Sequence, residues 1–182
     1  MKENENISIL KSVLEYVIWI AAVILLTWFL ITFVIQKLEV NGSSMVPTLE
    51  NGDQLMMEKV SYRFGDPERF DIVVFPYAYQ EKTYFIKRVI GLPGETVQID
   101  MDGNIYIDGE ILEEDYGAET IEYPGLALDP ITLGEDEYFV LGDNRNNSED
   151  SRFPDVGNIR RDEIMGRAFI RLFPLSKFGF VD

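Results

Sequence analysis

An uncharged apolar stretch near the start of the chain constrains its fold more than any other feature. Residues 16–35 read YVIWIAAVILLTWFLITFVI and include no charged side chain. A helix rises about 1.5 Å per residue, so a run of this length matches the roughly 30 Å hydrocarbon core of a bilayer. We therefore predict a transmembrane anchor at 16–36, a short segment before it at 1–15, and one folded domain at 37–182.

Two other interpretations of this stretch fit the sequence less well. A cleavable secretory signal has an apolar region of about 7–15 residues that ends at small residues, whereas this run is longer and leads into QKLE. A buried helix of a soluble protein is the second alternative, but Trp19 and Trp28 on a segment with almost no polar face suit lipid better. We expect the segment to stay in place as an anchor in membrane lipid.

Charge is distributed unevenly along the chain. The net charge is −16, and residues 1–37 carry three lysines and three glutamates. The whole excess of negative charge therefore belongs to residues 38–182. An acidic domain is repelled by phosphate backbones, which argues against a nucleic-acid partner.

The chain contains no cysteine and no histidine. Disulfides, thiolate metal sites and cysteine nucleophiles are therefore excluded, and so is the usual base of serine hydrolases. A calcium loop starting at Asp143 would place Arg145 at the third position and Ser148 at the sixth, where an oxygen ligand and a glycine are needed. We expect no cofactor and no metal, and any hydrolase here needs another base.

After the anchor, the sequence changes to short alternating runs typical of β-strands. Asp-Gly pairs at 102–103 and 108–109 predict hairpin turns. A short helix is possible around 160–164, and the acidic segment 113–130, rich in glycine and proline, is predicted to be a surface excursion peripheral to the chemistry. The expected fold class is a mainly β domain. Its predicted strands include residues 54–60, 71–75, 95–100, 137–141 and 166–173.

Three dense segments combine turn residues with potentially reactive side chains: NGSSMVPTL at 41–49, FIKRVIGLPG at 85–94 and LGDNRNNSEDSR at 141–152. Taken singly, each can be interpreted as a turn, a strand end or a polar loop. Together they resemble the bacterial type I signal peptidases. The patterns that carry the resemblance are G-x-S-M-x-P-T-L, K-R-V-x-G-L-P-G and G-D-N-R-x-N-S-x-D-S-R, and it covers the anchor and most of residues 38–173.

The resemblance implies a membrane-bound serine endopeptidase with a mainly β catalytic domain. Such an enzyme removes signal peptides from exported preproteins after small residues of the Ala-x-Ala type, with Ser44 as nucleophile and Lys87 as general base. The single anchor and small size are similar to the Gram-positive form. That form implies that residues 1–15 lie in the cytosol and that residues 37–182 lie outside the cell membrane.

The chemistry of the Ser44 and Lys87 pair can also be argued from the residues. A serine needs a neighbouring base, and a lysine serves only when neutral. Burial can lower a lysine pKa by up to about 3–5 units from about 10.4. Strand alternation should then send the permanent charge of Arg88 outward while Lys87 points inward; the alternative is that both are solvated surface cations. The apolar neighbours of Lys87 are Tyr84, Phe85, Ile86, Val89 and Ile90.

Further roles follow from the resemblance. Ser148 would hydrogen-bond and orient the Lys87 amine, and Asp150 with Arg152 would form an ion pair that shapes the floor of the site, where Asp143 braces the loop. The Ser44 N–H is the natural first oxyanion donor. For the second donor, some family members carry a serine hydroxyl where this chain and other members have glycine, here Gly42, and the sequence leaves open whether a backbone N–H or water takes its place. Ser43 competes as nucleophile, but the reactive serine of the family directly precedes methionine. Shallow apolar pockets for substrate side chains would be lined by Met45, Leu49 and Ile86.

One departure from the family pattern concerns a turn. The family often has Arg-Gly-Asp before the strand at 71–75, where this chain has Arg69-Phe70-Asp71. Two other functions are weaker alternatives. A self-cleaving Ser/Lys repressor would need a DNA-binding part that this acidic, anchored chain lacks, and an inactive tethered scaffold would not need the complete set of site residues.

Overall fold

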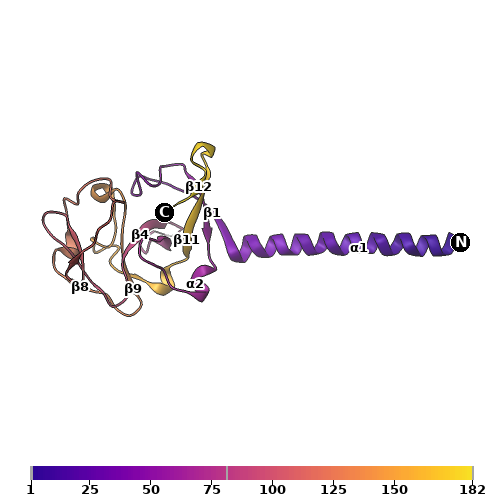
Figure 1. The fold of residues 1–182 in the computed structure, drawn as a ribbon, viewed down its shortest axis with the longest axis horizontal. Coiled ribbons are helices and arrows are strands. Elements are labelled where there is room, and N and C mark those ends of the chain that lie inside the picture. Colours follow the sequence, from indigo (N-terminus) through magenta and orange to yellow (C-terminus); the bar gives the residue numbers. More distant parts are fainter. Residues whose placement is uncertain (1, 81, 182) are drawn as a thin grey trace.

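One long apolar helix and one β-rich domain make up the molecule (Figure 1). The computed structural model describes residues 2–80 and 82–181, with side chains from residue 11 onward. Helix α1 (Lys2–Phe29) continues through the π-helical turn η1 (Leu30–Val34) and projects away from the domain. Its segment Lys11–Val34 is long and apolar enough to cross a membrane, and no part of its most apolar window is buried against the domain.

The apolar helix leads directly into the first strand. Strand β1 (Ile35–Glu39) starts at the residue after η1 and pairs antiparallel with β2 (Gln54–Glu58), beginning with Ile35 opposite Glu58. The helical span therefore ends at Val34, two residues before the predicted end at 36, because Ile35 and Gln36 already belong to the sheet.

Two antiparallel sheets form the domain. The large sheet has the order β1-β2-β11-β3-β4-β9-β10, with β12 paired to β11, and the small sheet has the order β7-β6-β5-β8. The small sheet lies toward the end of the domain far from α1 (Figure 1). The remaining strands are β3 (Ile72–Pro76), β4 (Tyr84–Gly91), β5 (Thr96–Ile99), β6 (Ile105–Ile107), β7 (Glu110–Ile111), β8 (Ile131–Thr132), β9 (Glu137–Leu141), β10 (Ile159–Arg160), β11 (Gly166–Phe173) and β12 (Gly179–Phe180).

The predicted mainly β fold is confirmed, and so is its strand pattern. Each predicted run overlaps one strand, namely β2, β3, β5, β9 or β11. Both Asp-Gly pairs lie at turns, since 102–103 joins β5 to β6 and 108–109 joins β6 to β7. The described short helices are α2 (Ser61–Phe64) and the 3-10 turns η2 (Gly125–Leu128), η3 (Arg145–Asn147), η4 (Arg161–Glu163) and η5 (Leu175–Lys177).

The buried side chains form three clusters that position the candidate site. One cluster, which includes Met45, Leu49 and Val74, packs under the loop that follows β1. A second lies between the small sheet and the ends of β4 and β9, and a third covers β3, β4 and β9 with residues such as Val73 and Val89. Strand β4 contributes to all three clusters, so its side chains are held from several directions.

Candidate active site

Ser44 lies in the turn that follows β1, and a second loop holds this turn in place. The Asn144 backbone N–H donates to the Ser44 carbonyl at 3.0 Å, and the Asn144 side-chain amide donates to the Ser43 carbonyl at 3.0 Å. The Asn147 amide donates to the Ser43 hydroxyl at 2.9 Å. Three hydrogen bonds thus tie the predicted nucleophile segment to the 142–148 loop, although the two lie about a hundred residues apart in the sequence.

Close approach of the two loops requires glycine at position 142. A methyl group added at Gly142 would collide with the Ser44 carbonyl and with the Ser148 hydroxyl. Gly142 also donates its N–H to the Asp150 carboxylate at 3.1 Å. Any larger residue would push the 142–148 loop away from Ser44.

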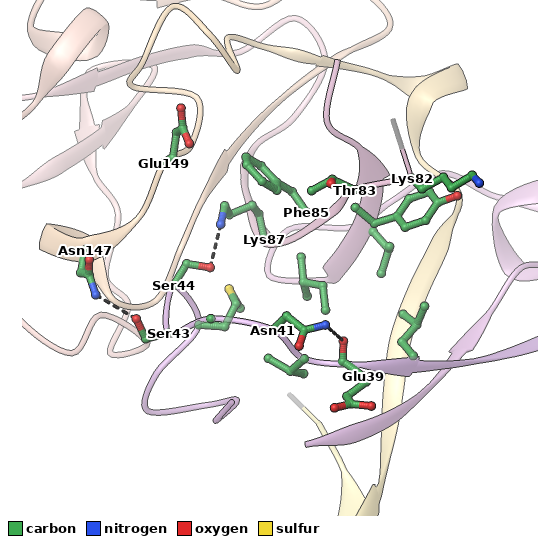
Figure 2. A pocket seen from close by; sticks show the side chains of 17 residues that line it. Glu39, Asn41, Ser43, Ser44, Lys82, Thr83, Phe85, Lys87, Asn147 and Glu149 are labelled. Atoms are coloured by element: carbon green, nitrogen blue, oxygen red, sulfur yellow. Dashed lines mark hydrogen bonds between the residues drawn. The ribbon is translucent and has the colours of Figure 1, made fainter. Parts of the chain in front are cut away.

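Lys87 meets Ser44 directly. Its Nζ donates to the Ser44 Oγ at 2.8 Å, from the middle of β4 (Figure 2). The Lys87 side chain is buried, with 3% of its surface exposed. The amine also lies 4.9 Å from the centre of the Phe85 ring. The alternative in which Lys87 is a solvated surface cation is therefore wrong.

Burial changes the acid–base behaviour of this amine. Loss of solvent lowers the pKa of Lys87 to about 8, because desolvation disfavours the charged form. The nearby carboxylates of Asp150 and Glu149 oppose this shift, whereas the Arg152 guanidinium adds to it. A substantial fraction of the amine is therefore neutral under mildly alkaline conditions.

Arg88 does not point outward to solvent, which corrects the prediction made from strand alternation. It takes the opposite side of β4 from Lys87, but that side is covered, and Arg88 has 0% of its surface exposed. Its guanidinium donates from Nε to the Asp143 Oδ1 at 2.9 Å and from Nη2 to the Asp143 Oδ2 at 2.8 Å. The Tyr116 ring stacks over it at 3.7 Å. The segment 113–130 is therefore not peripheral, because it supplies the lid over Arg88.

Asp143 braces its loop, as predicted, by joining three parts of the chain. Besides the two bonds from Arg88, its Oδ2 accepts a hydrogen bond from the Thr48 hydroxyl at 2.5 Å. Thr48 follows Ser44 in the same turn. The Asp143 carboxylate thus links the predicted nucleophile segment to β4 on the side opposite the Lys87 amine.

Phe70 stands where the family often has the glycine of Arg-Gly-Asp, and the structure shows which turn geometry it adopts. Its φ is +74°, the left-handed conformation that glycine adopts without strain. Phe70 keeps this conformation while its carbonyl accepts from Arg88 Nη1 at 2.9 Å and its ring packs 5.0 Å from the Tyr116 ring. The backbone conformation expected of glycine is retained, and the added ring packs against Tyr116, whose own ring lies over Arg88.

Asp150 and Arg152 form the predicted ion pair. Arg152 donates from Nε and Nη2 to the Asp150 carboxylate at 2.8 and 2.9 Å, and both side chains are buried. Arg152 also donates to the Arg145 and Tyr123 carbonyls. The predicted hydrogen bond from Ser148 to Lys87 is absent, since the buried Ser148 hydroxyl has no hydrogen-bond partner among the described residues. Ser148 packs against Gly142 instead.

A cleft of about 470 Å³ opens beside Ser44 and Lys87. The segments 38–45 and 82–87 form its two long sides (Figure 2). Met45 and Ile86 line the cleft as predicted, but Leu49 does not. The turn from 45 to 49, closed by a bond from the Leu49 N–H to the Met45 carbonyl, directs Leu49 into the core, where it is 0% exposed.

Several supporting residues had no signal in the sequence. Tyr116 and Glu114 lie in the irregular acidic segment 113–130, yet Glu114 accepts from the buried Arg145 at 2.6 Å. No spacing rule relates these residues to the motifs, because only the folded path of the segment brings them to the 142–152 loop. Asn147 stood inside a motif, but its bond to Ser43 could not be deduced from the pattern.

The family model and the curated relatives indicate the same family. The family model described as "Signal peptidase, peptidase S26" matches residues 13–173. "Probable signal peptidase I-2" of Synechocystis sp. is 44% identical over 155 residues, which cover 82% of this chain and 68% of that protein. "Signal peptidase I" of Bacillus licheniformis is 33% identical over 189 residues and is covered in full, as is this chain. A crystal structure of a signal peptidase I from Enterococcus faecalis V583 aligns with a TM-score of 0.47 and 37% identity, over 57% of this chain and 97% of that one.

The buried Arg88–Asp143 pair predicts a large stability effect. Asp143→Ala leaves the Arg88 guanidinium buried without its carboxylate, so we expect the free energy of unfolding to fall by about 3–5 kcal/mol. Denaturant unfolding of the full chain in detergent, followed by circular dichroism, measures the change. Asp162→Ala removes a carboxylate from an exposed pair with Arg160 and should have a far smaller effect. Equal losses in the two variants would contradict the assignment.

Proposed function

The chain belongs to the signal peptidase family, peptidase S26, and from this membership we propose that Ser44 is the nucleophile and Lys87 the general base of its reaction. The chain is a serine peptidase of the signal peptidase I type. One observation supports the roles of the two residues above all others, namely the 2.8 Å contact between the buried Lys87 Nζ and the Ser44 Oγ. A serine becomes an effective nucleophile when an adjacent base accepts its proton.

The proposed reaction proceeds through an acyl-enzyme. Neutral Lys87 takes the proton of the Ser44 hydroxyl as Oγ attacks the carbonyl carbon of the scissile bond. The Ser44 backbone N–H donates to the oxyanion that forms. Lys87 then returns the proton to the departing amine, the C–N bond breaks, and an ester to Ser44 remains. The Lys87 amine, which is neutral again, then activates a water molecule that hydrolyses this ester.

The supporting residues act by holding this geometry. Asp150 binds the Gly142 N–H and the Arg152 guanidinium, which keeps the 142–152 loop against the nucleophile turn. Asp143 anchors the same turn through Thr48. Loss of either carboxylate would leave a buried charge unpaired and let Ser44 move relative to Lys87.

The proposed substrate is the signal peptide of an exported preprotein, cut after small residues of the Ala-x-Ala type. An extended peptide fits between the two long sides of the cleft, where backbone groups of 38–41 and 82–86 can pair with it as an added strand. Met45 and Ile86 line apolar surface near Ser44. Small side chains match such shallow apolar surface better than large ones. An acidic domain makes nucleic acid an unsuitable partner.

Removal of either member of the pair should abolish cleavage. Ser44→Ala has no nucleophile and Lys87→Ala has no base, so each variant should cut a purified preprotein at least about 1,000-fold more slowly than wild type. The assay is cleavage in detergent with product masses recorded. Wild type should release a product that begins after an Ala-x-Ala sequence.

Ser43→Ala is the matched control, because Ser43 is adjacent but its hydroxyl bonds to Asn147 rather than to Lys87. It should retain activity within about ten-fold of wild type. The assignment fails if Ser43→Ala is the inactive variant, or if Ser44→Ala cuts normally while circular dichroism shows that all the variants are folded.

Cleavage should also depend on pH through Lys87. Because burial lowers the pKa of Lys87 to about 8, the neutral base accumulates as the pH rises through that value. The rate should therefore rise about ten-fold per unit below pH 7 and level off above about pH 9. Initial rates at fixed substrate concentration on the stable enzyme measure this profile. A rate that falls steadily from about pH 6 to about pH 9 is incompatible with a lysine base.

The proposed topology has residues 1–15 in the cytosol, the apolar helix in membrane lipid and the catalytic domain outside. A chain without cysteine allows a direct test, because a single introduced thiol has no competitor. Glu110→Cys, on an exposed strand, should react with a membrane-impermeant maleimide on intact cells, whereas Asn4→Cys should react only after lysis. The reverse pattern would show the opposite orientation.

A further inference from the structure

The cleft continues past the Ser44–Lys87 pair on the side away from the groove between 38–41 and 82–86. Ser43, Asn147 and Glu149 line this continuation, while Lys82 and Thr83 lie at the other end (Figure 2). In the proposed function, the groove takes the residues before the scissile bond. The continuation then faces the residues after it, which belong to the departing chain.

Glu149 is the charged group of this continuation. It is exposed, but it stands between Ser148 and Asp150, both of which are buried. The Asp150–Arg152 pair fixes the backbone on one side, so the Glu149 side chain is presented toward the cleft. Among the described residues, Glu149 is in no salt bridge. Its carboxylate accepts a hydrogen bond from the Tyr77 hydroxyl at 3.4 Å.

Aromatic rings lie beside this carboxylate. The Tyr77 and Phe85 rings are stacked, with centroids 4.4 Å apart and planes inclined by 12°. The Phe85 ring already has the Lys87 Nζ 4.9 Å from its centre. Aromatic faces and a carboxylate both attract cations, and a long side chain can cover a ring with its stem while its charged end reaches an acid.

We propose that the Glu149 carboxylate, beside the Tyr77 ring that Phe85 holds by stacking, forms a subsite for a basic side chain in the first two residues after the scissile bond. This inference rests on the proposed function, which places the departing chain on this side of Ser44. An acidic side chain at the same positions faces the Glu149 carboxylate and is disfavoured. The subsite selects among substrates whose residues before the scissile bond are equally suitable.

The test uses the full chain in detergent and two peptide substrates that differ only by lysine or glutamate at the second residue after the Ala-x-Ala sequence. A second pair carries the change at the first residue. Wild type should favour the lysine peptide of at least one pair by about five-fold or more in kcat/KM. Glu149→Gln should bring that ratio close to one. Glu110→Gln removes the same charge from the small sheet and should keep the wild-type ratio.

A second readout separates a charge effect from a structural one. The Glu149 carboxylate raises the pKa of Lys87, so Glu149→Gln should move the rising limb of the pH–rate profile to lower pH, while Glu110→Gln should not. A ratio that stays at the wild-type value in Glu149→Gln overturns the subsite, as does a ratio that collapses equally in Glu110→Gln. Equal cleavage of both peptides in each pair by wild type also overturns it but leaves the proposed function standing. Failure to cut any of the four contradicts the proposed function itself.

Discussion

A lysine amine held out of water and against a serine hydroxyl is the arrangement on which the rest of the site depends. Burying an amine costs free energy unless the group gives up its proton, and this cost is what lowers the pKa of Lys87 to about 8. The 2.8 Å contact with Ser44 can serve the proposed reaction only while the amine is largely shielded from bulk solvent. The apolar clusters around β4 and the closely apposed 142–148 loop bury Lys87 and leave only 3% of its surface exposed at the cleft.

Lys87 and Arg88 are adjacent on β4 and both are buried, but their side chains have different electrostatic partners. Among the described residues, no carboxylate hydrogen-bonds the desolvated Lys87 amine, whereas the desolvated Arg88 has Asp143 bonded to two of its nitrogens. A buried ion pair such as Arg88–Asp143 contributes little net stability. It does hold both side chains in place, because separating them would leave each buried charge unpaired. Since Asp143 also binds Thr48, the position of the turn that carries Ser44, the proposed nucleophile, is coupled to the strand that carries Lys87, the proposed base.

The sequence was sufficient for the strands, the hairpin turns and the Ser44–Lys87 pairing, because these depend on local alternation, turn chemistry and ordered motifs. It was insufficient wherever a segment distant in the sequence determines the surroundings of a side chain. Alternation correctly put Arg88 on the far side of β4 but could not reveal that Tyr116 covers that side. The orientation of Leu49 and the unpartnered hydroxyl of Ser148 likewise depend on packing between loops. For Phe70 the residue type argues against the observed backbone: phenylalanine disfavours the left-handed conformation that the fold imposes at this position.

The apolar helix leads directly into β1, and this limits how far Ser44 can lie from the end of the helix. Only residues 35–43 lie between the end of the apolar span at Val34 and Ser44, and a fully extended chain from Val34 to Ser44 covers at most about 35 Å. Residues 30–39 contain no irregular linker between helix and sheet, because η1 ends at Val34 and β1 pairs with β2 from Ile35. In the proposed topology, this short connection limits the distance between Ser44 and the bilayer surface. A peptide bond held farther than that from the bilayer would lie out of reach of Ser44, however well its side chains fit the cleft.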